Sequence, residues 1–268
     1  MTFAEAVFLG IIQGATEFLP VSSSGHLVIA EYFMDLGEVS IDFDVILHLG
    51  TLMAVLSYFW RDWLAMAASV LSGKMSDRKK QSRRMLLFVL AGTIPGAVAG
   101  FLVEDLVSTV FRSPWVVVST LAGVALLLWL AERTARYSRN SNQMILKDAV
   151  AIGTAQAAAL IPGVSRSGIT MTAALFLGLK REAAARFSFL LSAPIIAGAG
   201  VYQGLKLAQT GFACVSVAYL WGFLAAGISG YIAIAFLMRY LINHTFYPFV
   251  YYRLIIAFIV AVVLKVGG

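Results

Sequence analysis

The sequence has few charged residues for its length. Only 13% of its 268 residues are charged, whereas 60% are hydrophobic and the mean hydropathy is +0.86. A soluble domain carries about 25% charged residues, because its surface faces water. The composition therefore excludes an ordinary soluble globular protein and predicts a chain that lies mostly in lipid.

Cysteine is almost absent. The single cysteine, Cys214, lies in an apolar segment, so neither a disulfide framework nor a cysteine metal cluster can form. The chain also begins without the basic segment and the small-residue cleavage site of a secretory signal peptide. We therefore expect membrane insertion to use internal spans.

Positive charge exceeds negative charge, with 20 Lys and Arg against 14 Asp and Glu. The basic residues gather in two segments between apolar runs, 61–84 and 133–147, and do not form a stripe over a folded surface. This distribution argues against a nucleic-acid partner. The positive-inside rule predicts that both segments are cytoplasmic. The acidic pair Glu104 and Asp105, accompanied by Arg112, suits the opposite side.

Six apolar runs approach the roughly 20 residues that a bilayer crossing needs. They cover residues 42–60, 84–103, 114–131, 186–207, 214–238 and 248–266. Two other apolar stretches, 3–36 and 147–179, are interrupted by Pro, Gly and Ser in LPVSSSGH and IPGVSRSG. Broken backbone at membrane depth needs cover from protein or water, so both stretches predict re-entrant helix-loop-helix hairpins. A pair of interfacial helices or a kinked span is the alternative for each.

The two interrupted stretches resemble each other. Five residues of the first match five of the second at the same spacing: Gly10, Gln13, Ser22, Ser24 and Gly25 match Gly153, Gln156, Ser165, Ser167 and Gly168. We interpret this match as an internal duplication within one membrane domain, with repeats at about 1–142 and 143–268. Each repeat has one hairpin and an odd number of spans, so the second repeat is inverted relative to the first. Inverted repeats bring their interruptions together near the bilayer midplane.

The predicted fold class is thus an all-α integral membrane protein with six transmembrane helices and two re-entrant hairpins. Few polar side chains lie at membrane depth in this arrangement, and most of them belong to the hairpins. The first hairpin carries Gln13, Glu17, Ser22, Ser23, Ser24 and His26, and the second carries Ser165, Arg166, Ser167 and Thr170. An ionisable group in the membrane is costly unless it is paired, so these residues are functional candidates.

The residue types in the hairpins suit phosphoryl transfer. Gln13 and Glu17 share a helix face and offer oxygen ligands for Mg²⁺ or Ca²⁺, held jointly with substrate phosphates. The serines precede helical segments, whose free backbone N–H groups favour an anion. Arg166 can clamp phosphate oxygens, and His26 lies within one helical turn of Ser23 and is expected to take its proton. Helix capping by the serines and a packing role for His26 are the structural alternatives.

Other polar and aromatic residues are less informative. His48 is equally compatible with a structural and a functional role, whereas His244 and Arg186 are expected at the membrane interface. Aromatic residues near the span ends fit interfacial belts. They are Trp60, Trp63, Trp115, Tyr247, Tyr251 and Tyr252.

The motifs QGATEFLPVSSSGHL and PGVSRSGIT resemble the two signatures of the bacitracin-resistance type undecaprenyl-diphosphate phosphatases. The resemblance extends to FDVILHLGT, FSFLLSAP and PFVYYRLIIA, and so covers essentially the whole chain. It implies a bacterial inner-membrane enzyme whose active site opens to the periplasm. Such an enzyme hydrolyses a polyprenyl diphosphate lipid, undecaprenyl diphosphate, to the monophosphate, which recycles the lipid carrier of peptidoglycan synthesis and confers bacitracin resistance.

Motif positions carry the roles of the family onto this chain. The resemblance implies that Glu17 and Gln13 bind metal or diphosphate and that Ser23 and His26 act as nucleophile and as base or acid. It assigns phosphate binding to Arg166 with Ser165, Ser167 and Thr170. Because Gln13 carries no charge, Glu17 is the one carboxylate that this pair offers to a metal.

A secondary transporter or a lipid-phosphate flippase is the competing interpretation, because such proteins are also built from inverted repeats and broken helices. Transport of an anion needs no nucleophile or base, so this interpretation leaves Ser23 and His26 unexplained. A purely structural subunit would gain nothing from its buried charges. The sequence leaves open whether Ser23, His26 or water is the nucleophile, and whether the protein is a homodimer.

Overall fold

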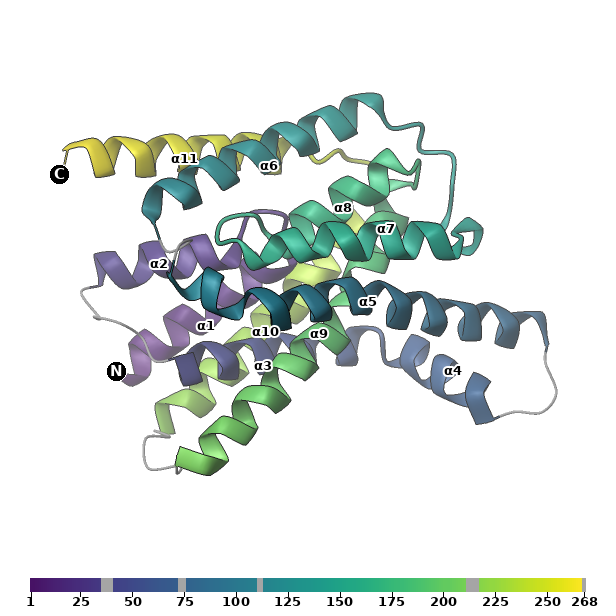
Figure 1. Ribbon diagram of the computed structural model, residues 1–268, viewed down its shortest axis with the longest axis horizontal. Helices are drawn as coiled ribbons and strands as arrows, with labels where there is room; N and C mark the ends of the chain where they lie inside the picture. Colours follow the sequence, from purple (N-terminus) through teal and green to yellow (C-terminus); the bar gives the residue numbers. More distant parts are fainter. Residues whose placement is uncertain (35–40, 72–75, 110–112, 211–216, 267–268) are drawn as a thin grey trace.

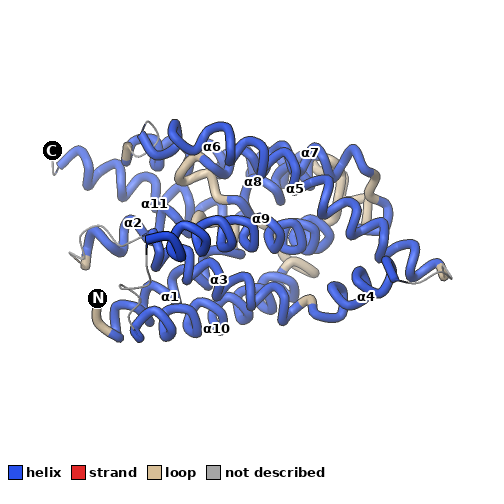
Figure 2. Tube along the Cα trace, turned by 60° about the horizontal axis from the view of Figure 1, so that its bottom comes forward, coloured by secondary structure: helices blue, strands red, loops and turns tan. Residues whose placement is uncertain are grey.

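The computed structural model describes residues 1–34, 41–71, 76–109, 113–210 and 217–266, and these residues form an all-helical bundle (Figure 2). Cys214 and Arg112 lie outside the described residues, as do the side chains of Glu104 and Asp105. The α-helices are α1 (Phe3–Phe18), α2 (Ser23–Phe33), α3 (Ile41–Tyr58), α4 (Trp60–Leu71), α5 (Asp77–Thr109), α6 (Pro114–Thr134), α7 (Leu146–Ala157), α8 (Arg166–Phe176), α9 (Arg181–Thr210), α10 (Val217–Tyr240) and α11 (Tyr247–Val266).

Among the described residues, 5 helices are long and apolar enough to cross a membrane, namely α5, α6, α9, α10 and α11. A sixth is reached if α3 and α4, which are bent by 75° at their junction, form one broken span. The chain is therefore a multi-pass membrane protein. The predicted spans 84–103, 114–131 and 186–207 lie within α5, α6 and α9, respectively, and the predicted span 248–266 lies within α11. The described part of the predicted span 214–238 lies in α10.

The segment after residue 60 differs from the sequence-based expectation of a loop. It forms α4, which turns Met66 and Ser69 inward and leaves Leu64 and Leu71 exposed. The next helix, α5, has 33 residues, about 50 Å at 1.5 Å per residue, whereas the hydrocarbon core of a bilayer is about 30 Å thick. The charged first turns of α5 and the whole of α4 project from the bundle in both views (Figures 1 and 2).

Each interrupted stretch forms two helices with a break between them. The helices α1 and α2 flank residues 19–22, and α7 and α8 flank residues 158–165, where a single 3-10 turn covers Ala158–Leu160. Local signals explain where these pairs begin. Thr2 and Glu5 cap the start of α1 reciprocally, and the Asp148 carboxylate accepts the Ile145 N–H at the start of α7.

The two hairpins pack against helices from the other half of the sequence. The helix α1 lies along α10, and α7 lies along α5. Glycines permit this close approach. A Cβ added at Gly10 would lie 2.4 Å from the Gly222 oxygen, and one added at Gly153 would lie 2.0 Å from the Gly92 oxygen. Gly10 and Gly153, which occupy matching positions in the two stretches, are therefore helix contact points.

The ends of the bundle differ in what they carry. Both ends of the described chain lie at one end of the molecule, while α4 lies at the other (Figure 1). The helices α6 and α11 run side by side along one edge (Figure 1). The main apolar core lies between the hairpins and α9, where the Phe18 ring meets the Phe189 ring edge-on at 5.4 Å. This core places the two breaks in the middle of the bundle.

Substitution of Gly153 by Ala should loosen the contact of α7 with α5. The new methyl group would collide with the Gly92 carbonyl, and overpacking of this kind costs about 1–3 kcal/mol. We expect the thermal unfolding midpoint in detergent to fall by roughly 3–10 °C. Gly123→Ala on α6 is the matched control, because a Cβ there meets nothing within 4 Å. Equal midpoints for the two variants would contradict the glycine contact.

Candidate active site

The two breaks share one local geometry. Ser22 and Ser165 stand in the left-handed region, with φ of 78° and 70°, a conformation that costs a non-glycine residue about 1–2 kcal/mol. Their hydroxyls accept the N–H groups of Gly25 and Gly168, at 3.4 and 3.1 Å. Each hydroxyl also lies within 3.4 Å of the serine two residues further on. The capping role that was an alternative for these serines is therefore confirmed.

The helices that follow the two breaks, α2 and α8, each begin with a residue that is hydrogen-bonded to the Glu17 carboxylate. Ser23, the first residue of α2, donates its hydroxyl to Glu17 Oε2 at 2.6 Å, and Arg166, the first residue of α8, donates Nη2 to Glu17 Oε1 at 2.7 Å. The side chains of Glu17 and Arg166 are only 7% and 11% exposed. Helix N-termini carry free N–H groups and partial positive charge. The predicted meeting of the two breaks is thus observed, and its centre is Glu17.

Two further side chains approach Glu17. Gln13 donates its amide nitrogen to Oε2 at 3.2 Å, one helical turn before Glu17 on α1. His48 on α3 lies with Nε2 3.7 Å from the same oxygen, and its Nδ1 is 2.8 Å from the Asp44 carbonyl. The sequence did not decide between a structural and a functional role for His48. The structure places it beside Glu17.

A cavity of about 330 Å³ opens next to this group. Its polar lining comes from Glu17, Asp44, His48, Gln156 and Arg166. The rest of the lining is apolar: Val45, Gly96, Ala159, Leu160, Ile195, Ile196, Ala199 and Gly200. A cavity that is lined by both charged and apolar residues can take a polar group that is attached to a hydrocarbon chain.

Several buried polar atoms on or near the cavity wall have no hydrogen-bond partner. They are the oxygens Asp44 Oδ1 and Gln156 Oε1 and the nitrogen Gln156 Nε2, all from lining residues, and Gln13 Oε1 beside Glu17. Buried polar atoms are normally satisfied, so these atoms indicate that something else binds here. Carboxylate and amide oxygens are the ligands that hard divalent cations prefer. The residues present therefore fit a Mg²⁺ or Ca²⁺ ion.

The predicted contact between His26 and Ser23 does not form. His26 Nδ1 lies 2.7 Å from the Ser22 carbonyl, so this nitrogen carries the proton, and Nε2 lies 2.7 Å from the Tyr252 hydroxyl. The carbonyl one helical turn back and the hydroxyl from α11 occupy both ring nitrogens, and Ser23 is bonded to Glu17 instead. Tyr252, which we expected in an interfacial belt, is exposed near the start of α11, and its ring also stacks on His26 with centroids 5.5 Å apart.

The remaining predicted residues hold the hairpins together. Ser167 donates to the Leu19 carbonyl at 2.9 Å, which joins the second hairpin to the first. The Thr170 hydroxyl is buried and lies 2.7 Å from the Ser188 hydroxyl, whereas Ser24 is exposed. Their predicted contacts with phosphate remain predictions.

The two residues expected at the interface lie away from Glu17. Arg186 pairs with Asp62 on α4 at 2.5 Å. His244 is exposed and stacks on the Tyr240 ring, with centroids 4.4 Å apart. Neither residue reaches the active-site cavity.

Sequence reasoning missed Arg253. This residue of α11 is 0% exposed and has no carboxylate partner among the described residues. Its guanidinium donates at 3.0–3.4 Å to carbonyl oxygens of both breaks and of α6, which belong to Pro20, Gly163, Val164, Thr120 and Leu121. The one signal in the sequence was a lone arginine in the apolar run FVYYRLIIA, which we interpreted only as part of a span.

Substitution of Arg253 by Met should destabilise both breaks together. It would leave buried carbonyls without donors, at about 1–3 kcal/mol for each unsatisfied group. We expect the thermal unfolding midpoint in detergent to fall by about 10 °C or more, with only part of the loss recovered in Arg253→Lys. Arg133→Met is the control, because Arg133 is exposed over the Trp129 ring. An unchanged midpoint for Arg253→Met would show that the breaks hold without the guanidinium.

Comparison with known proteins identifies the family of this chain. Residues 6–259 match the family described as "Bacitracin resistance protein BacA". A protein of Rubrobacter xylanophilus named undecaprenyl-diphosphatase is 49% identical over 265 residues, 97% of each chain. Proteins of the same name from Moorella thermoacetica and Geotalea daltonii are 44% and 46% identical, over 98% and 100% of each chain. The chain therefore belongs to the bacitracin resistance protein BacA family.

Proposed function

We infer that the protein is an undecaprenyl-diphosphatase, which hydrolyses undecaprenyl diphosphate to undecaprenyl phosphate and inorganic phosphate. Its similar relatives carry that name along their whole length. The structural observation that carries the inference is the convergence of both hairpin motifs on Glu17. In the cell this reaction recycles the lipid carrier of peptidoglycan synthesis and confers resistance to bacitracin.

The charges around Glu17 suit a diphosphate. Arg166 offers several N–H donors, and the first turns of α2 and α8 add backbone N–H groups that have no helical partner. All three lie inside the bundle, where electrostatic interactions are stronger than in water. Donors that are fixed before the substrate arrives stabilise the charge that develops on the phosphoryl oxygens in the transition state.

We propose that Ser23 is the nucleophile and that Glu17 is its base, because they share the 2.6 Å hydrogen bond. The Ser23 oxygen attacks the terminal phosphorus, the bond from that phosphorus to the bridging oxygen breaks, and the lipid monophosphate leaves. The hydroxyl proton passes to Glu17, which later releases it. Water then cleaves the phosphoserine; one of its protons restores the hydroxyl and the other stays on the phosphate.

His26 remains a catalytic candidate in this scheme, as an acid rather than as the base for Ser23. It stands one turn further along α2 than Ser23, and Tyr252 is bonded to its ring. The Tyr252 hydroxyl gives His26 a route for a proton toward α11. The phosphate contacts of Ser22, Ser24, Ser165, Ser167 and Thr170 are proposals of the same kind.

We also propose that Glu17 and Gln13 hold Mg²⁺ or Ca²⁺ together with phosphate oxygens of the substrate. The unsatisfied oxygens of Gln13 and Asp44 support this proposal. No group of three or more His, Cys, Asp or Glu side chains with the spacing of a metal site occurs among the described residues. The protein would therefore supply only part of the coordination shell. When bound, the cation would neutralise the diphosphate and polarise its phosphoryl group.

Hydrolysis should depend on the Glu17 group. In detergent with Mg²⁺ or Ca²⁺, we expect phosphate release from undecaprenyl diphosphate to fall at least about 100-fold in Glu17→Gln, Ser23→Ala and Arg166→Ala, because each loses a group that acts in the transition state. A chelator should stop the wild type, and either cation should restore it. Arg186→Ala is the control, because that arginine pairs with Asp62 outside the site.

Each variant is first shown to be folded by its unfolding midpoint. A wild type that binds the lipid without releasing phosphate would instead favour a transporter or flippase. If Ser23→Ala alone retained activity, water and not Ser23 would be the nucleophile. If Arg166→Ala retained activity, the proposed binding of phosphate oxygens by Arg166 would be contradicted.

The membrane arrangement that we propose has six spans, the sixth being α3 with α4, and two re-entrant hairpins in inverted repeats. The matching packing of α1 on α10 and of α7 on α5 supports inversion, as do the left-handed serines at both breaks. We place the basic segments in the cytoplasm of a bacterial cell, the protein in its inner membrane and the active-site opening toward the periplasm.

Labelling of single cysteines tests this orientation. In a Cys214→Ser background, Thr2→Cys should react with an impermeant maleimide added to intact spheroplasts. Ser138→Cys should react only after the cells are opened, because it lies between α6 and α7 on the basic side. Both positions are exposed, so each serves as the control of the other. The reverse pattern would invert the proposed topology.

A further inference from the structure

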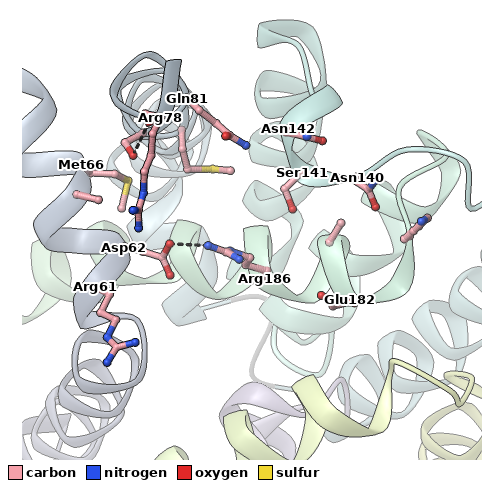
Figure 3. Close-up of a pocket in the computed structure, with 15 residues that line it drawn as sticks. Arg61, Asp62, Met66, Arg78, Gln81, Asn140, Ser141, Asn142, Glu182 and Arg186 are labelled. Atoms are coloured by element: carbon pink, nitrogen blue, oxygen red, sulfur yellow. Dashed lines mark hydrogen bonds and ion pairs between the residues drawn. The ribbon is translucent and has the colours of Figure 1, made fainter. Parts of the chain in front are cut away.

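A second cavity, of about 450 Å³, lies among the basic segments and shares no lining residue with the active-site cavity. Its walls come from α4, the first turns of α5, the connector between α6 and α7, and the start of α9 (Figure 3). Both halves of the sequence therefore contribute to it. The charged residues on its walls are Arg61, Asp62, Arg78, Lys180, Glu182 and Arg186.

The cations on this wall are not fully paired. Arg186 binds Asp62 through Nη2 at 2.5 Å, but its Nε is buried and has no hydrogen-bond partner. The side chains of Arg78 and Lys180 form no ion pair with any residue that the structure describes. In Figure 3 the Arg78 guanidinium points across the cavity toward Asp62 and Arg186. Donors from α5, from α9 and from the residue directly before α9 thus line one space.

Arg61 and Glu182 modify this picture. Arg61 lies over the Trp60 ring at 5.2 Å and points away from the cavity (Figure 3), so it is not counted among the donors. Glu182 lies on the wall at the start of α9 and adds negative charge. Asp62 is already paired with Arg186. Three cations, Arg78, Lys180 and Arg186, therefore stand against two carboxylates, Asp62 and Glu182, which leaves one excess positive charge on the wall.

Neutral donors complete the lining. Amide and hydroxyl groups of Gln81, Ser82, Asn140, Ser141 and Asn142 border the cavity. Figure 3 shows Gln81 and Ser141 turned toward the space between α5 and α9. Guanidinium groups with surrounding amides and hydroxyls match the oxygens of a tetrahedral anion, and a buried N–H without an acceptor favours such an occupant.

We propose that this cavity is a second phosphate-binding site, separate from the site at Glu17, which takes a phosphate monoester or free phosphate on the basic face of the protein. The neighbouring helix α4 exposes Trp60, Leu64 and Leu71, a pattern typical of a helix that lies in the membrane interface. A phosphate group on a lipid would reach the cavity at this depth. The proposal does not depend on hydrolysis at Glu17.

Binding measurements on the full-length protein in detergent test the second site. The probes are inorganic phosphate and farnesyl phosphate, titrated by calorimetry into Arg166→Ala, in which the clamp at Glu17 is removed. We expect one remaining binding step. Adding Arg78→Gln and Arg186→Gln should weaken that step at least 10-fold, whereas adding Arg83→Gln, an exposed residue of α5 outside the cavity, should leave it unchanged.

Two further comparisons distinguish free phosphate from a lipid phosphate and keep the test valid if one variant does not fold. Binding of both probes assigns the shared phosphate group, and binding of farnesyl phosphate alone assigns a lipid. If the variant lacking both arginines does not fold, Arg78→Gln alone carries the test with a loss of at least 3-fold, because Arg78 is exposed and unpaired among the described residues. In the wild-type background, Arg78→Gln should hydrolyse undecaprenyl diphosphate within 2-fold of wild type. No binding to Arg166→Ala, or equal binding to the cavity variants, would overturn the proposal.

Discussion

The buried guanidinium of Arg253 is the interaction on which the centre of this molecule depends. Two helical hairpins end inside the bundle, and each break leaves carbonyl groups that no helix can satisfy. Arg253 donates to carbonyls of both breaks and of α6 at once. Because the breaks are held there, Ser22 and Ser165 can keep their left-handed backbone. Ser23 and Arg166, one residue further on, then meet at Glu17.

Glu17 combines tasks that enzymes often divide between several acids. One oxygen accepts the arginine, and the other accepts both the serine and the Gln13 amide. Its negative charge offsets Arg166 before the substrate arrives, so the guanidinium need not be buried without a partner. A diphosphate would compete with Glu17 for the same N–H groups. In the proposed mechanism, binding of the substrate would therefore release the carboxylate that we propose as the base.

The sequence was sufficient where the signal was local. Pro, Gly and Ser interruptions located both breaks, and five of the six apolar runs located the long helices α5, α6, α9, α10 and α11. The shared spacing of Gln13 and Ser22 with Gln156 and Ser165 predicted that the breaks meet. Contacts across the fold were not predictable in this way. His26 and Tyr252 are 226 residues apart, and nothing in the spacing around His26 indicates the tyrosine that displaces Ser23 as its partner. The role of Arg253 was unpredictable for the same reason, because its partners are main-chain carbonyls far away in the sequence, and every residue has such a carbonyl.

The glycine contacts of α1 with α10 and of α7 with α5 make the two halves of the chain interleaved. Each hairpin is supported by a helix of the other half: α5 is already made when α7 follows it, but α1 has its final neighbour only after α10 has been translated. A half produced alone would present a glycine-lined helix face with nothing to cover it. Two halves made as separate polypeptides would have to exchange hairpins as they assemble, which is the topology of a domain-swapped dimer fused into one chain.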